Sequence, residues 1–375
     1  MRILLVGGAV RNILLGLPVR DRDYLVLDAT VEDFLCAHPT AKAVGKTFPV
    51  FILDHQEFSF PRAATLEEDL TLRDFTVNAL ALDTDGRLFC HPQALDDMQN
   101  KVLRPASPAS LPEDPLRVLR AARFLAELPG FRPHEDLLAD MRAVCASGKL
   151  VTPYAERVGQ EVQKAMNAPC PGEFLRVLGQ TGCLLPWLAE LDGASDIAAG
   201  PPQYHDASVL EHTARVMDRL AGDPMSVWMG LCHDLGKVLT PAEILPRHIG
   251  HDLRGEAAAQ ALGTRLRLPM RLILAGADAA RWHMVAGNYP ELKASTRVDL
   301  LTRLKSRGVL REMFRLVQAD KSRDHGELMR ADLAALLAVT LPPEARNLGE
   351  KSGEVLRTLR IQALQAQKQN DAPQR

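Results

Sequence analysis

The sequence predicts an α+β protein, in which a small mixed α/β domain is followed by a long helical region. Three observations support this prediction. Over the first hundred residues, short apolar runs alternate with segments of helical pattern. Beyond about Pro112 the signals for strands stop, and apolar residues recur at helical spacing. The 375 residues, of which 46% are hydrophobic, are enough for two or more domains and a sizeable core.

The first domain is expected to contain short elements in alternation. The expected strands are residues 2–6, 24–27, 50–53, 57–60, 87–90 and 102–103. The expected helices are residues 9–15, residues 31–37 and a segment from Thr65 toward Leu80. Thr30 is suited to cap the second helix, and Thr65-Leu66-Glu67-Glu68 forms a capping box that opens the third.

The helical region divides into two blocks. The first block is expected to contain helices at residues 116–128, 137–146, 155–166 and 174–180. Residues 198–203 are rich in Gly and Pro and predict a linker. A second helical block follows from residue 209 to about 324, and the Gln-rich end, residues 362–375, is expected to be frayed.

Composition narrows the functional class. No apolar stretch is long enough to cross a bilayer, so no membrane partner is expected. The six cysteines include no C-x-x-C pair, which favours free thiols in a reducing cytoplasm over a disulfide framework. The net charge of −2 does not indicate nucleic-acid binding, but arginine clusters in the helical region leave that function open.

The first candidate site contains two glycines, an arginine and two aspartates. Asp21 and Asp23 stand two apart at a strand start, where alternate residues share a face. Two neighbouring carboxylates repel unless a cation joins them, and Mg²⁺ prefers such oxygen ligands together with substrate phosphates. Gly7 and Gly8 let backbone N–H groups approach a phosphate, and Arg11 adds a cation. Taken alone, a solvated turn explains these residues equally well.

Polar residues further along the chain support a nucleotide site. Asp74 and Asn78 are four apart on the expected helix, so both can reach a ribose hydroxyl while Arg73 contacts phosphate. An ordinary polar helix face is the alternative. Asp114 stands at a helix start, either as a plain cap or, with Arg117, as a set of acceptors and donors for a base edge.

The segments GGAVRN, DRD, LRDFTVNALA and EDPLRVLRAARF resemble, in order and spacing, the motifs of the class II tRNA nucleotidyltransferases, the CCA-adding enzymes and their poly(A) polymerase relatives. The resemblance covers most of the chain. It implies a polymerase-β-like nucleotidyltransferase head followed by a helical neck, body and tail. It also implies that the tRNA 3′-hydroxyl attacks the α-phosphate of CTP or ATP without a nucleic-acid template.

The resemblance implies a role for each matched residue. Asp21 and Asp23 would be catalytic and hold Mg²⁺. The implied nucleotide-binding residues are Gly7, Gly8, Arg11, Arg73, Asp74, Asn78, Asp114, Arg117 and Arg120.

The second candidate site is a series of histidines in the second helical block. Of the eleven histidines, six lie between His205 and His283. The segment CHDLGK contains adjacent His233 and Asp234, within an order H…HD…H…H…D that isolated structural histidines do not explain well. Imidazoles and carboxylates together suit a transition metal such as Ni²⁺, Mn²⁺ or Zn²⁺.

This series resembles the HD phosphohydrolase domain found in a bacterial subgroup of the same family. The implied metal ligands are His212, His233, Asp234, His251, His283 and Asp320. The implied activities are phosphatase, 2′-nucleotidase and 2′,3′-cyclic phosphodiesterase, which would clear a phosphate from a damaged tRNA end. A helical domain that retains its histidines without activity is the alternative. The implied domains are residues 1–108 for the head, 109–200 for neck and body, 201–330 for the HD domain and 331–375 for the tail.

Three short motifs depart from the family's pattern. Asn12 ends the GG motif where the family has Asp. Leu72 stands where the family has the first Arg of Arg-Arg-Asp. The hinge motif retains only Asp97, with His91 and Ala94 at its other two positions, so the hinge movement between C and A addition is in doubt.

The largest departure is a missing loop. Only Ala63 and Ala64 separate Arg62 from the Thr65 capping box, where CCA-adding relatives have a long flexible loop. In the family that loop helps to switch specificity from CTP to ATP. We therefore expect addition of CC to be favoured over full CCA. A metal phosphohydrolase whose head only binds RNA is the competing hypothesis.

Overall fold

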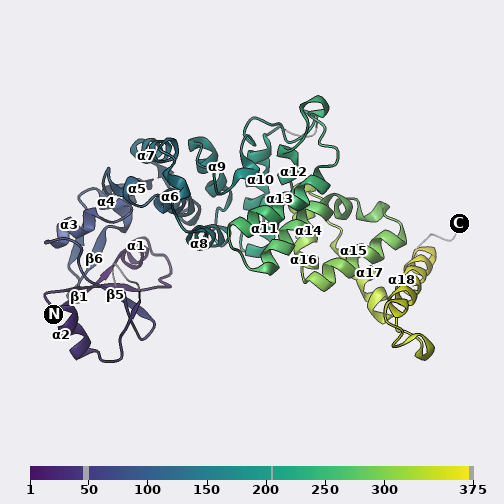
Figure 1. Ribbon diagram of the computed structural model, residues 1–375, viewed down its shortest axis with the longest axis horizontal. Helices are drawn as coiled ribbons and strands as arrows, with labels where there is room; N and C mark the ends of the chain where they lie inside the picture. The colour runs from purple at the N-terminus through teal and green to yellow at the C-terminus, as the bar shows by residue number, and fades with distance from the viewer. Residues whose placement is uncertain (45–49, 204–205, 371–375) are drawn as a thin grey trace. The chain divides into compact units, whose positions relative to one another are not determined.

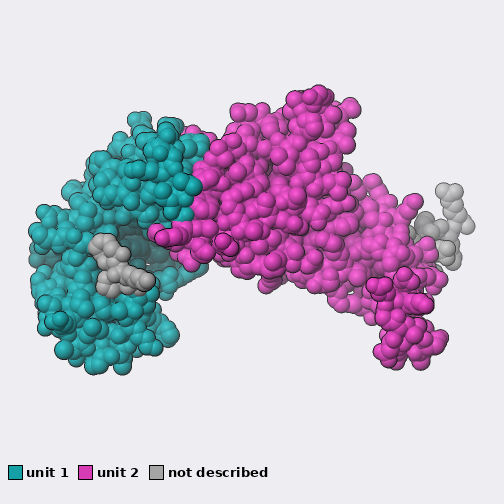
Figure 2. Space-filling model, viewed as in Figure 1, with its two compact units in different colours: residues 1–153, 181–183 teal, residues 154–180, 184–375 magenta. Residues whose placement is uncertain are grey.

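The computed structural model describes residues 1–44, 50–203 and 206–370 (Figure 1). The chain forms two compact units, residues 1–153 with 181–183, and residues 154–180 with 184–375 (Figure 2). His205 and residues 371–375 lie outside the described residues. Among the helices that are described, none has the length and apolar character needed to span a membrane.

The first unit is built on a mixed sheet of seven strands. In spatial order these are β3 (Lys42–Val44), β4 (Val50–Leu53), β5 (Gln56–Ser59), β2 (Asp23–Leu27), β1 (Arg2–Val6), β6 (Leu80–Leu82) and β7 (Leu88–Cys90). Strands β2 and β5 pair in parallel, and the other neighbours are antiparallel. A separate parallel pair joins β8 (Val102–Leu103) to β9 (Arg132–Pro133).

Both faces of the sheet carry a hydrophobic core, because side chains alternate along each strand. On β2, Leu25 belongs to a cluster that includes Leu70 of α3 (Leu66–Thr71). The next residue, Val26, belongs to the opposite cluster with Phe34 of α2 (Val31–Ala37). The remaining helices of this unit are α1 (Gly8–Leu14), η1 (Thr76–Asn78), α4 (Ala94–Gln99), α5 (Ser110–Glu113), α6 (Leu116–Glu127), α7 (Glu135–Ala146) and η2 (Lys149–Val151).

Most predicted elements of the first unit are confirmed, including the capping box at Thr65 and the cap at Thr30. The helix predicted from Thr65 toward Leu80 is wrong beyond Thr71. There the chain turns, and Phe75 becomes extended and fully buried in a bridge with Pro105. Strands β3, β6 and β9 were not predicted, and β9 shows that strands continue beyond Pro112. Tertiary pairing forms these short strands, so local pattern does not reveal them.

The second unit is helical. Its helices are α8 (Ala155–Met166), α9 (Gly172–Thr181, whose last residue belongs to the first unit), α10 (Val209–Arg219), α11 (Pro224–Cys232), α12 (Leu235–Val238), α13 (His251–Arg265), α14 (Met270–Gly287), α15 (Ala294–Arg307), α16 (Leu310–Lys321), α17 (Gly326–Ala338) and α18 (Glu350–Asn370). Short 3₁₀ turns lie at η3 (Ala189–Leu191), η4 (Ala242–Ile244), η5 (Tyr289–Glu291) and η6 (Pro343–Ala345). Helix α14 packs against α11, α13, α15 and α16 and forms the centre of the unit.

Two predictions for this unit need correction. The end predicted to be frayed is helical as far as Asn370, because α18 extends through residues 362–370. The predicted linker at residues 198–203 is partly fixed, since Ala198 bridges to Ser208 and its carbonyl lies 2.8 Å from His248 Nε2. The backbone of this segment therefore supports the histidine cluster described below.

Candidate functional site

The ends of three adjacent strands bring the first group of residues together. Val6, the last residue of β1, pairs with Asp23, the first residue of β2. Gly7 follows Val6, and its N–H donates to the Leu80 carbonyl at 3.0 Å, two residues beyond Asn78. The Gly-Gly turn, Asp23 and the segment containing Asn78 therefore meet at one end of the sheet.

Asp21 lies before β2 rather than within it. Both Asp21 and Asp23 are exposed, but the strand begins only at Asp23. Strand alternation therefore does not apply to Asp21, and a shared face for the two carboxylates stays a prediction. Burial and the Glu57 charge are the main causes that raise the pKa of Asp23, and the Asp21 charge adds to them.

A third carboxylate, Glu57, lies beside Asp23. The two residues are partners in the parallel pairing of β2 and β5. Partial desolvation of the carboxylate and then the Glu57 charge raise the pKa of Asp23, and Arg73 only partly opposes them. A cation would relieve this repulsion, as Mg²⁺ does in carboxylate sites. The sequence analysis missed Glu57, because local pattern does not show that β5 pairs with β2.

Gly7 is required at its position. Its φ is +70°, and a Cβ there would lie 3.4 Å from Arg73 NH1. Arg73 itself is held near Asp69, with NH2 3.7 Å from Oδ2. The Nε of Arg73 is buried and has no hydrogen-bond partner among the described residues. An anion beside the Gly-Gly turn would satisfy that donor.

A chain of hydrogen bonds connects α6 to α1 through four side chains. Arg120 NH2 donates to Asp74 Oδ2 at 2.5 Å, and Asn78 Nδ2 donates to Asp74 Oδ1 at 3.0 Å. Arg11 NH1 donates to Asn78 Oδ1 at 2.5 Å. Phe124 lies among the arginines, with the Arg11 guanidinium 5.1 Å from its ring centre. Asn78 and Asp74 thus hold the guanidinium groups of Arg11 and Arg120, and both guanidinium groups lie near the Phe124 ring.

Asp74 and Asn78 do not share a helix, although their side chains meet as predicted. Both are buried, and each is bonded to an arginine. Burial alone would raise the pKa of Asp74, but the Arg120 ion pair and hydrogen bonds from Asn78 and Phe75 lower it to about 2. In this structure the two residues position Arg11 and Arg120, and their ribose contacts stay a prediction.

Asp114 and Arg117 lie at the junction of α5 and α6. Asp114 Oδ1 accepts from Leu116 N at 3.2 Å, so it caps α6. Arg117 NH2 donates to the Leu72 carbonyl at 3.1 Å, and NH1 donates to Ser110 Oγ at 2.9 Å. These bonds fix the Arg117 guanidinium against the turn after α3. The reading of a base by this pair stays a prediction.

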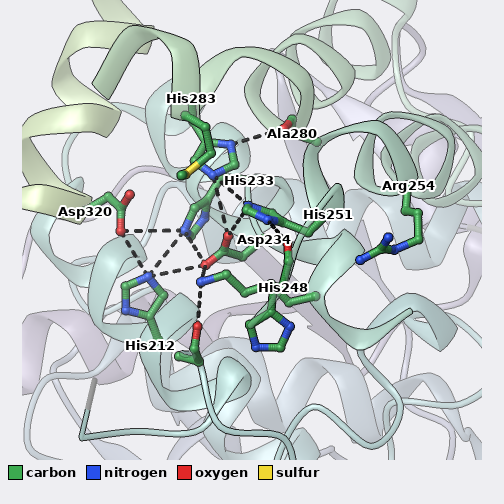
Figure 3. A network of polar contacts seen from close by, with 12 residues as sticks. His212, His233, Asp234, His248, His251, Arg254, Ala280, His283 and Asp320 are labelled. Atoms are coloured by element: carbon green, nitrogen blue, oxygen red, sulfur yellow. Dashed lines mark hydrogen bonds and ion pairs between the residues drawn. The ribbon is translucent and has the colours of Figure 1, made fainter. Parts of the chain in front are cut away.

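The six predicted metal ligands of the second unit do come together (Figure 3). They are His212 of α10, His233 and Asp234 between α11 and α12, His251 at the start of α13, His283 of α14 and Asp320 of α16. His212 Nε2 lies 3.1 Å from Asp320 Oδ1, and His251 Nε2 lies 3.2 Å from His283 Nε2. Residues from several helices and a helix junction thus converge on one point.

Backbone carbonyls orient three of the four imidazoles. The Nδ1 atoms of His233, His251 and His283 lie 2.6, 2.7 and 3.0 Å from the carbonyls of Gly230, His248 and Ala279. Each Nδ1 must therefore carry the proton and donate it, which leaves Nε2 with a free lone pair. All three Nε2 atoms face Asp234, at 3.1 to 3.6 Å from its oxygens. This tautomer is the one that binds metals.

Asp234 belongs to two possible metal-binding groups. One contains His212 and His233, and the other contains His251 and His283. Both carboxylate oxygens of Asp234 are buried and have no hydrogen-bond partner among the described residues, although Lys237 Nζ lies 2.7 Å from Oδ2. A buried carboxylate whose two oxygens face imidazoles on both sides fits a position between two cations, and Lys237 already pairs with one of these oxygens.

Electrostatics favour metal-binding protonation states at part of the cluster; at His233, burial would lower the pKa, but the neighbouring Asp234 raises it. Burial lowers the pKa of His251, and it lowers the pKa of His283 to about 3, so both rings are neutral at pH 7. Burial alone would raise the pKa of Asp234, but His233 and Lys237 hold it well below its usual range. Neutral imidazoles and ionised carboxylates are the ligand forms that bind divalent metals.

Two glycines allow the ligand-bearing helices to approach closely. A Cβ at Gly236 would collide with the His251 carbonyl oxygen, so α12 can contact α13 only without a side chain there. A Cβ at Gly276 would lie 2.8 Å from Cys232 Sγ, where α14 crosses α11. His248 has a different role, because its two ring nitrogens contact Thr240 Oγ1 and the Ala198 carbonyl. It fixes the loop before α13 and has no nitrogen free for a metal.

Comparison with known proteins decides the family. Residues 39–104 match a model of the poly A polymerase head domain. The multifunctional CCA protein of Xanthomonas oryzae pv. oryzae is 36% identical, over 99% of this chain and 100% of that protein. The chain belongs to the multifunctional CCA protein family. It is therefore a tRNA nucleotidyltransferase, and the predicted family is confirmed.

Other members of the multifunctional CCA protein family give the same result. The protein of Methylococcus capsulatus is 35% identical over 97% of this chain and 94% of that protein. The protein of Azoarcus is 38% identical over 81% of this chain and 78% of that protein.

Solved structures confirm the predicted fold class, a polymerase-β-like nucleotidyltransferase head followed by a helical body. The Bacillus stearothermophilus CCA-adding enzyme in complex with CTP has a TM-score of 0.67 at 23% identity, over 97% of this chain and 89% of that chain. The Thermotoga maritima CCA-adding enzyme complexed with tRNA has a TM-score of 0.64 at 19% identity, over 96% and 86%.

This member of the family has a short and fixed connection where the flexible loop is expected. Residues 60–65, all of them described, join β5 to α3. Arg62 N donates to Asp69 Oδ1 at 2.8 Å, and the Thr65 capping box closes the connection. The connection is thus six residues long and is bonded at both of its ends.

Asn12 is adapted to its surroundings. Its Oδ1 accepts from Arg11 NH2 at 2.9 Å. Its Nδ2 donates to the Pro18 carbonyl at 2.9 Å, which a carboxylate would not do. The amide thereby ties α1 to the segment that leads into Asp21.

Proposed function

We propose that this tRNA nucleotidyltransferase adds CC to tRNA 3′ ends from CTP and incorporates the final A poorly, and that its second unit is a metal-dependent phosphohydrolase. The observation that supports CC addition is the short connection fixed by Arg62 and Asp69, which replaces the loop that the resemblance associates with the change from CTP to ATP. The altered hinge motif at His91 and Ala94 supports it as well.

Transfer would take place where β1, β2 and β6 end. Asp21 and Asp23 would hold Mg²⁺, which supplies charge neutralisation at the triphosphate and activation of the tRNA 3′-hydroxyl. Arg73, beside the Gly-Gly turn, would bind phosphate through its Nε, which lacks a partner among the described residues. Arg11 and Arg120 are fixed by Asn78 and Asp74, so they need little reorganisation to contact the nucleotide.

Selection of the nucleotide would depend on Asp114 and Arg117. Arg117 is bonded to the turn that follows α3, the helix at which the short connection ends. With that connection fixed, the donors of Arg117 stay in one arrangement. A single arrangement would favour recognition of one base, C, over recognition of C and then A.

The extension assay decides between CC and CCA addition. A tRNA lacking its 3′ end is incubated with CTP alone, ATP alone and both, and the products are resolved by length. We expect CTP alone to give two added nucleotides and the mixture to give little further extension. Efficient addition of A in the mixture would contradict CC addition and leave the transferase assignment intact.

A gain-of-function variant makes the same test in the opposite direction. A flexible loop is inserted between Ala63 and Ala64. This lengthens the connection and leaves the hydrogen bond between Arg62 and Asp69 in place. We expect this variant to add A more efficiently than the parent. A matched insertion of equal length in the exposed turn at residues 84–86 is the control.

The phosphohydrolase assignment is supported by the buried cluster around Asp234. Its residues fit metal ions, because the Nε2 atoms of three imidazoles face the two oxygens of one buried carboxylate. His212, His233, Asp234, His251, His283 and Asp320 would hold one or two ions such as Ni²⁺, Mn²⁺ or Zn²⁺. Such ions supply a nucleophilic hydroxide and charge neutralisation at a phosphate ester.

The corresponding assay uses 2′-AMP, 2′,3′-cyclic AMP and a tRNA that ends in a cyclic phosphate, with each metal added to metal-free protein. Hydrolysis that needs an added transition metal supports the proposal. Tight metal binding without hydrolysis of any substrate would favour a structural histidine cluster instead.

A phosphohydrolase with an RNA-binding but inactive head is the second candidate, favoured only by the changes at Asn12, Leu72 and His91. Replacing Asp21 and Asp23 by Ala separates the two functions. Loss of nucleotide incorporation with hydrolysis retained supports the first proposal. Absence of incorporation in the unaltered protein supports the second.

A further inference from the structure

Helices α15 and α18 of the second unit enclose a groove that carries neither metal ligands nor predicted nucleotide contacts. Its volume is about 590 Å³, and four arginines line it: Arg303 and Arg307 from α15, and Arg357 and Arg360 from α18. The two helices pack directly against each other (Figure 1). Because the arginines on each helix are three or four residues apart, each pair lies on one helix face.

Among the described residues, two carboxylates offset these four cations. Asp299 is bonded to Arg357, with Oδ1 2.6 Å from Nε and Oδ2 2.7 Å from NH2. Asp278 accepts from Arg303 Nε at 2.8 Å, and Arg307 Nε lies 3.6 Å from its other oxygen. The groove therefore carries an excess of positive charge, centred on Arg307 and Arg360.

One donor in the groove is left without a hydrogen-bond partner in the described part of the chain. This donor is the Nε of Arg360, which is buried. Leaving such a donor unsatisfied is unfavourable, so a ligand that brings an acceptor oxygen would be stabilised there. This observation is independent of the charge excess and indicates the same class of ligand, an anion with oxygen acceptors.

The arginines are also held in position before any ligand arrives. The Arg303 guanidinium lies 5.6 Å from the centre of the Trp282 ring and is bonded to buried Asp278. Arg357 is fixed by two bonds to Asp299. Ordering long side chains opposes binding, and here that ordering is already present.

We infer that this groove binds phosphate groups of the tRNA backbone, as an anchoring site separate from both reactive centres. The guanidinium fork matches the geometry of a phosphate better than an ammonium does. The charge lies along two helices rather than at one point, and the side chains of Arg307 and Arg357 are 37% and 49% exposed, which suits a polyanion more than a single small anion. The identity of the RNA as tRNA rests on the proposed function.

The test is direct binding of tRNA to the full-length protein carrying Arg307→Ala and Arg360→Ala. These two arginines are chosen because Arg303 and Arg357 then remain to pair with Asp278 and Asp299, so no carboxylate is left alone. The matched control is Lys305→Ala with Lys351→Ala, which removes the same charge from the same two helices outside the groove. Fluorescence anisotropy with labelled tRNA is recorded at several salt concentrations.

The groove variant is expected to bind tRNA about tenfold more weakly. The slope of log Kd against log salt concentration is expected to fall by about one for each phosphate that the variant no longer neutralises. The control is expected to stay within about twofold of the parent. A second variant with Arg307→Lys and Arg360→Lys keeps the charge but loses the fork, and should lie between the two. A groove variant that behaves like the control would overturn the inference.

Titration with inorganic phosphate, followed by calorimetry, separates the sources of the anion. If the groove variant loses phosphate binding while its Kd for tRNA is unchanged, the site takes a small anion and the RNA inference is wrong. If the parent protein adds no nucleotide but the groove variant still loses tRNA affinity, the proposed function fails and the anchoring site stands.

Discussion

The two clusters of acidic residues in this protein differ most in their access to water. Asp21 and Asp23 are exposed, with arginines nearby whose bonds run to Asp74 and Asn78. Asp234 is 2% exposed and surrounded by imidazoles whose protons are fixed by backbone carbonyls. Under the proposed function both clusters bind a cation, and only the buried one surrounds it with protein ligands.

This difference separates two ways of using a metal. Exposed carboxylates hold Mg²⁺ weakly, so the ion is expected to arrive with the triphosphate that completes its coordination. Imidazoles and a buried carboxylate form a closed set of ligands, which would retain a transition metal without substrate. On the proposed function, we therefore expect the first centre to be assembled at each turnover and the second to be assembled on folding.

The sharpest test of the comparison removes the exposed carboxylates. In the variant with Asp21→Asn and Asp23→Asn, nucleotide incorporation is expected to fall by about 10³-fold or more, because several kcal/mol of metal-dependent stabilisation are lost. Phosphate release by the second unit should be unchanged. Asp28→Asn, which alters an exposed aspartate at the other end of β2, is the control. Comparable loss of both activities would break the separation of the two centres.

The complementary change is Asp234→Asn. An amide oxygen cannot balance two cations, so metal content, measured by mass spectrometry of the purified protein, is expected to fall by at least half, and hydrolysis by about 10²-fold. Incorporation of CTP should be retained. The exposed substitution Glu243→Gln serves as control. Undiminished metal content in Asp234→Asn would place the ion elsewhere.

A third test concerns the ion pair between Arg120 and Asp74, which holds Arg120 in place in the first unit. Arg120→Ala leaves buried Asp74 with only Asn78 and the Phe75 N–H as partners among the described residues. We expect about 2 kcal/mol of destabilisation, and a lower kcat for incorporation because Arg120 is lost. Calorimetry should show a shift in the transition of the first unit only. Arg120→Lys, which keeps the charge, should recover part of the loss, and full stability of Arg120→Ala would show that the ion pair contributes little.

The same ion pair predicts a pH dependence. The folded-state pKa of Asp74 is lowered to about 2, below the value of about 3.9 expected in the unfolded chain. Its contribution to stability is therefore complete above about pH 5 and is lost as the pH falls toward 2, by about 2 kcal/mol in total. Thermal unfolding of the parent and of Asp74→Asn should differ in slope between pH 5 and pH 3. Parallel curves would contradict the lowered pKa.

The smallest effect is expected from Asn12→Asp, which restores the family's residue. The new carboxylate keeps a bond to Arg11 but loses the donation to the Pro18 carbonyl. A gained ion pair and a lost hydrogen bond are similar in size, so stability and the KM for CTP should change little, by roughly 0.5 kcal/mol or less. A large gain in activity would identify Asn12 as a defect of the head.

Motif order was enough to predict the family and to name the six side chains that meet around Asp234, because the resemblance supplied their order along the chain. Their role as metal ligands, and that of Asp21 and Asp23, stays a prediction. Glu57 was missed, since only the parallel pairing of β2 with β5 brings it to Asp23. The expected helix through Asp74 and Asn78 was wrong, since Phe75 is drawn into a bridge with Pro105. In each case a contact distant in sequence decided the local structure.

The close crossing of α12 and α13 at Gly236 has a consequence for evolution. Any side chain at this position would push the two helices apart and separate Asp234 from His251, although every ligand would still be present. A descendant of this protein could thus lose the proposed second activity through a single codon outside the proposed ligand set. Retained histidines alone are then no proof of a working centre, and the glycine of HDLGK must be read together with them.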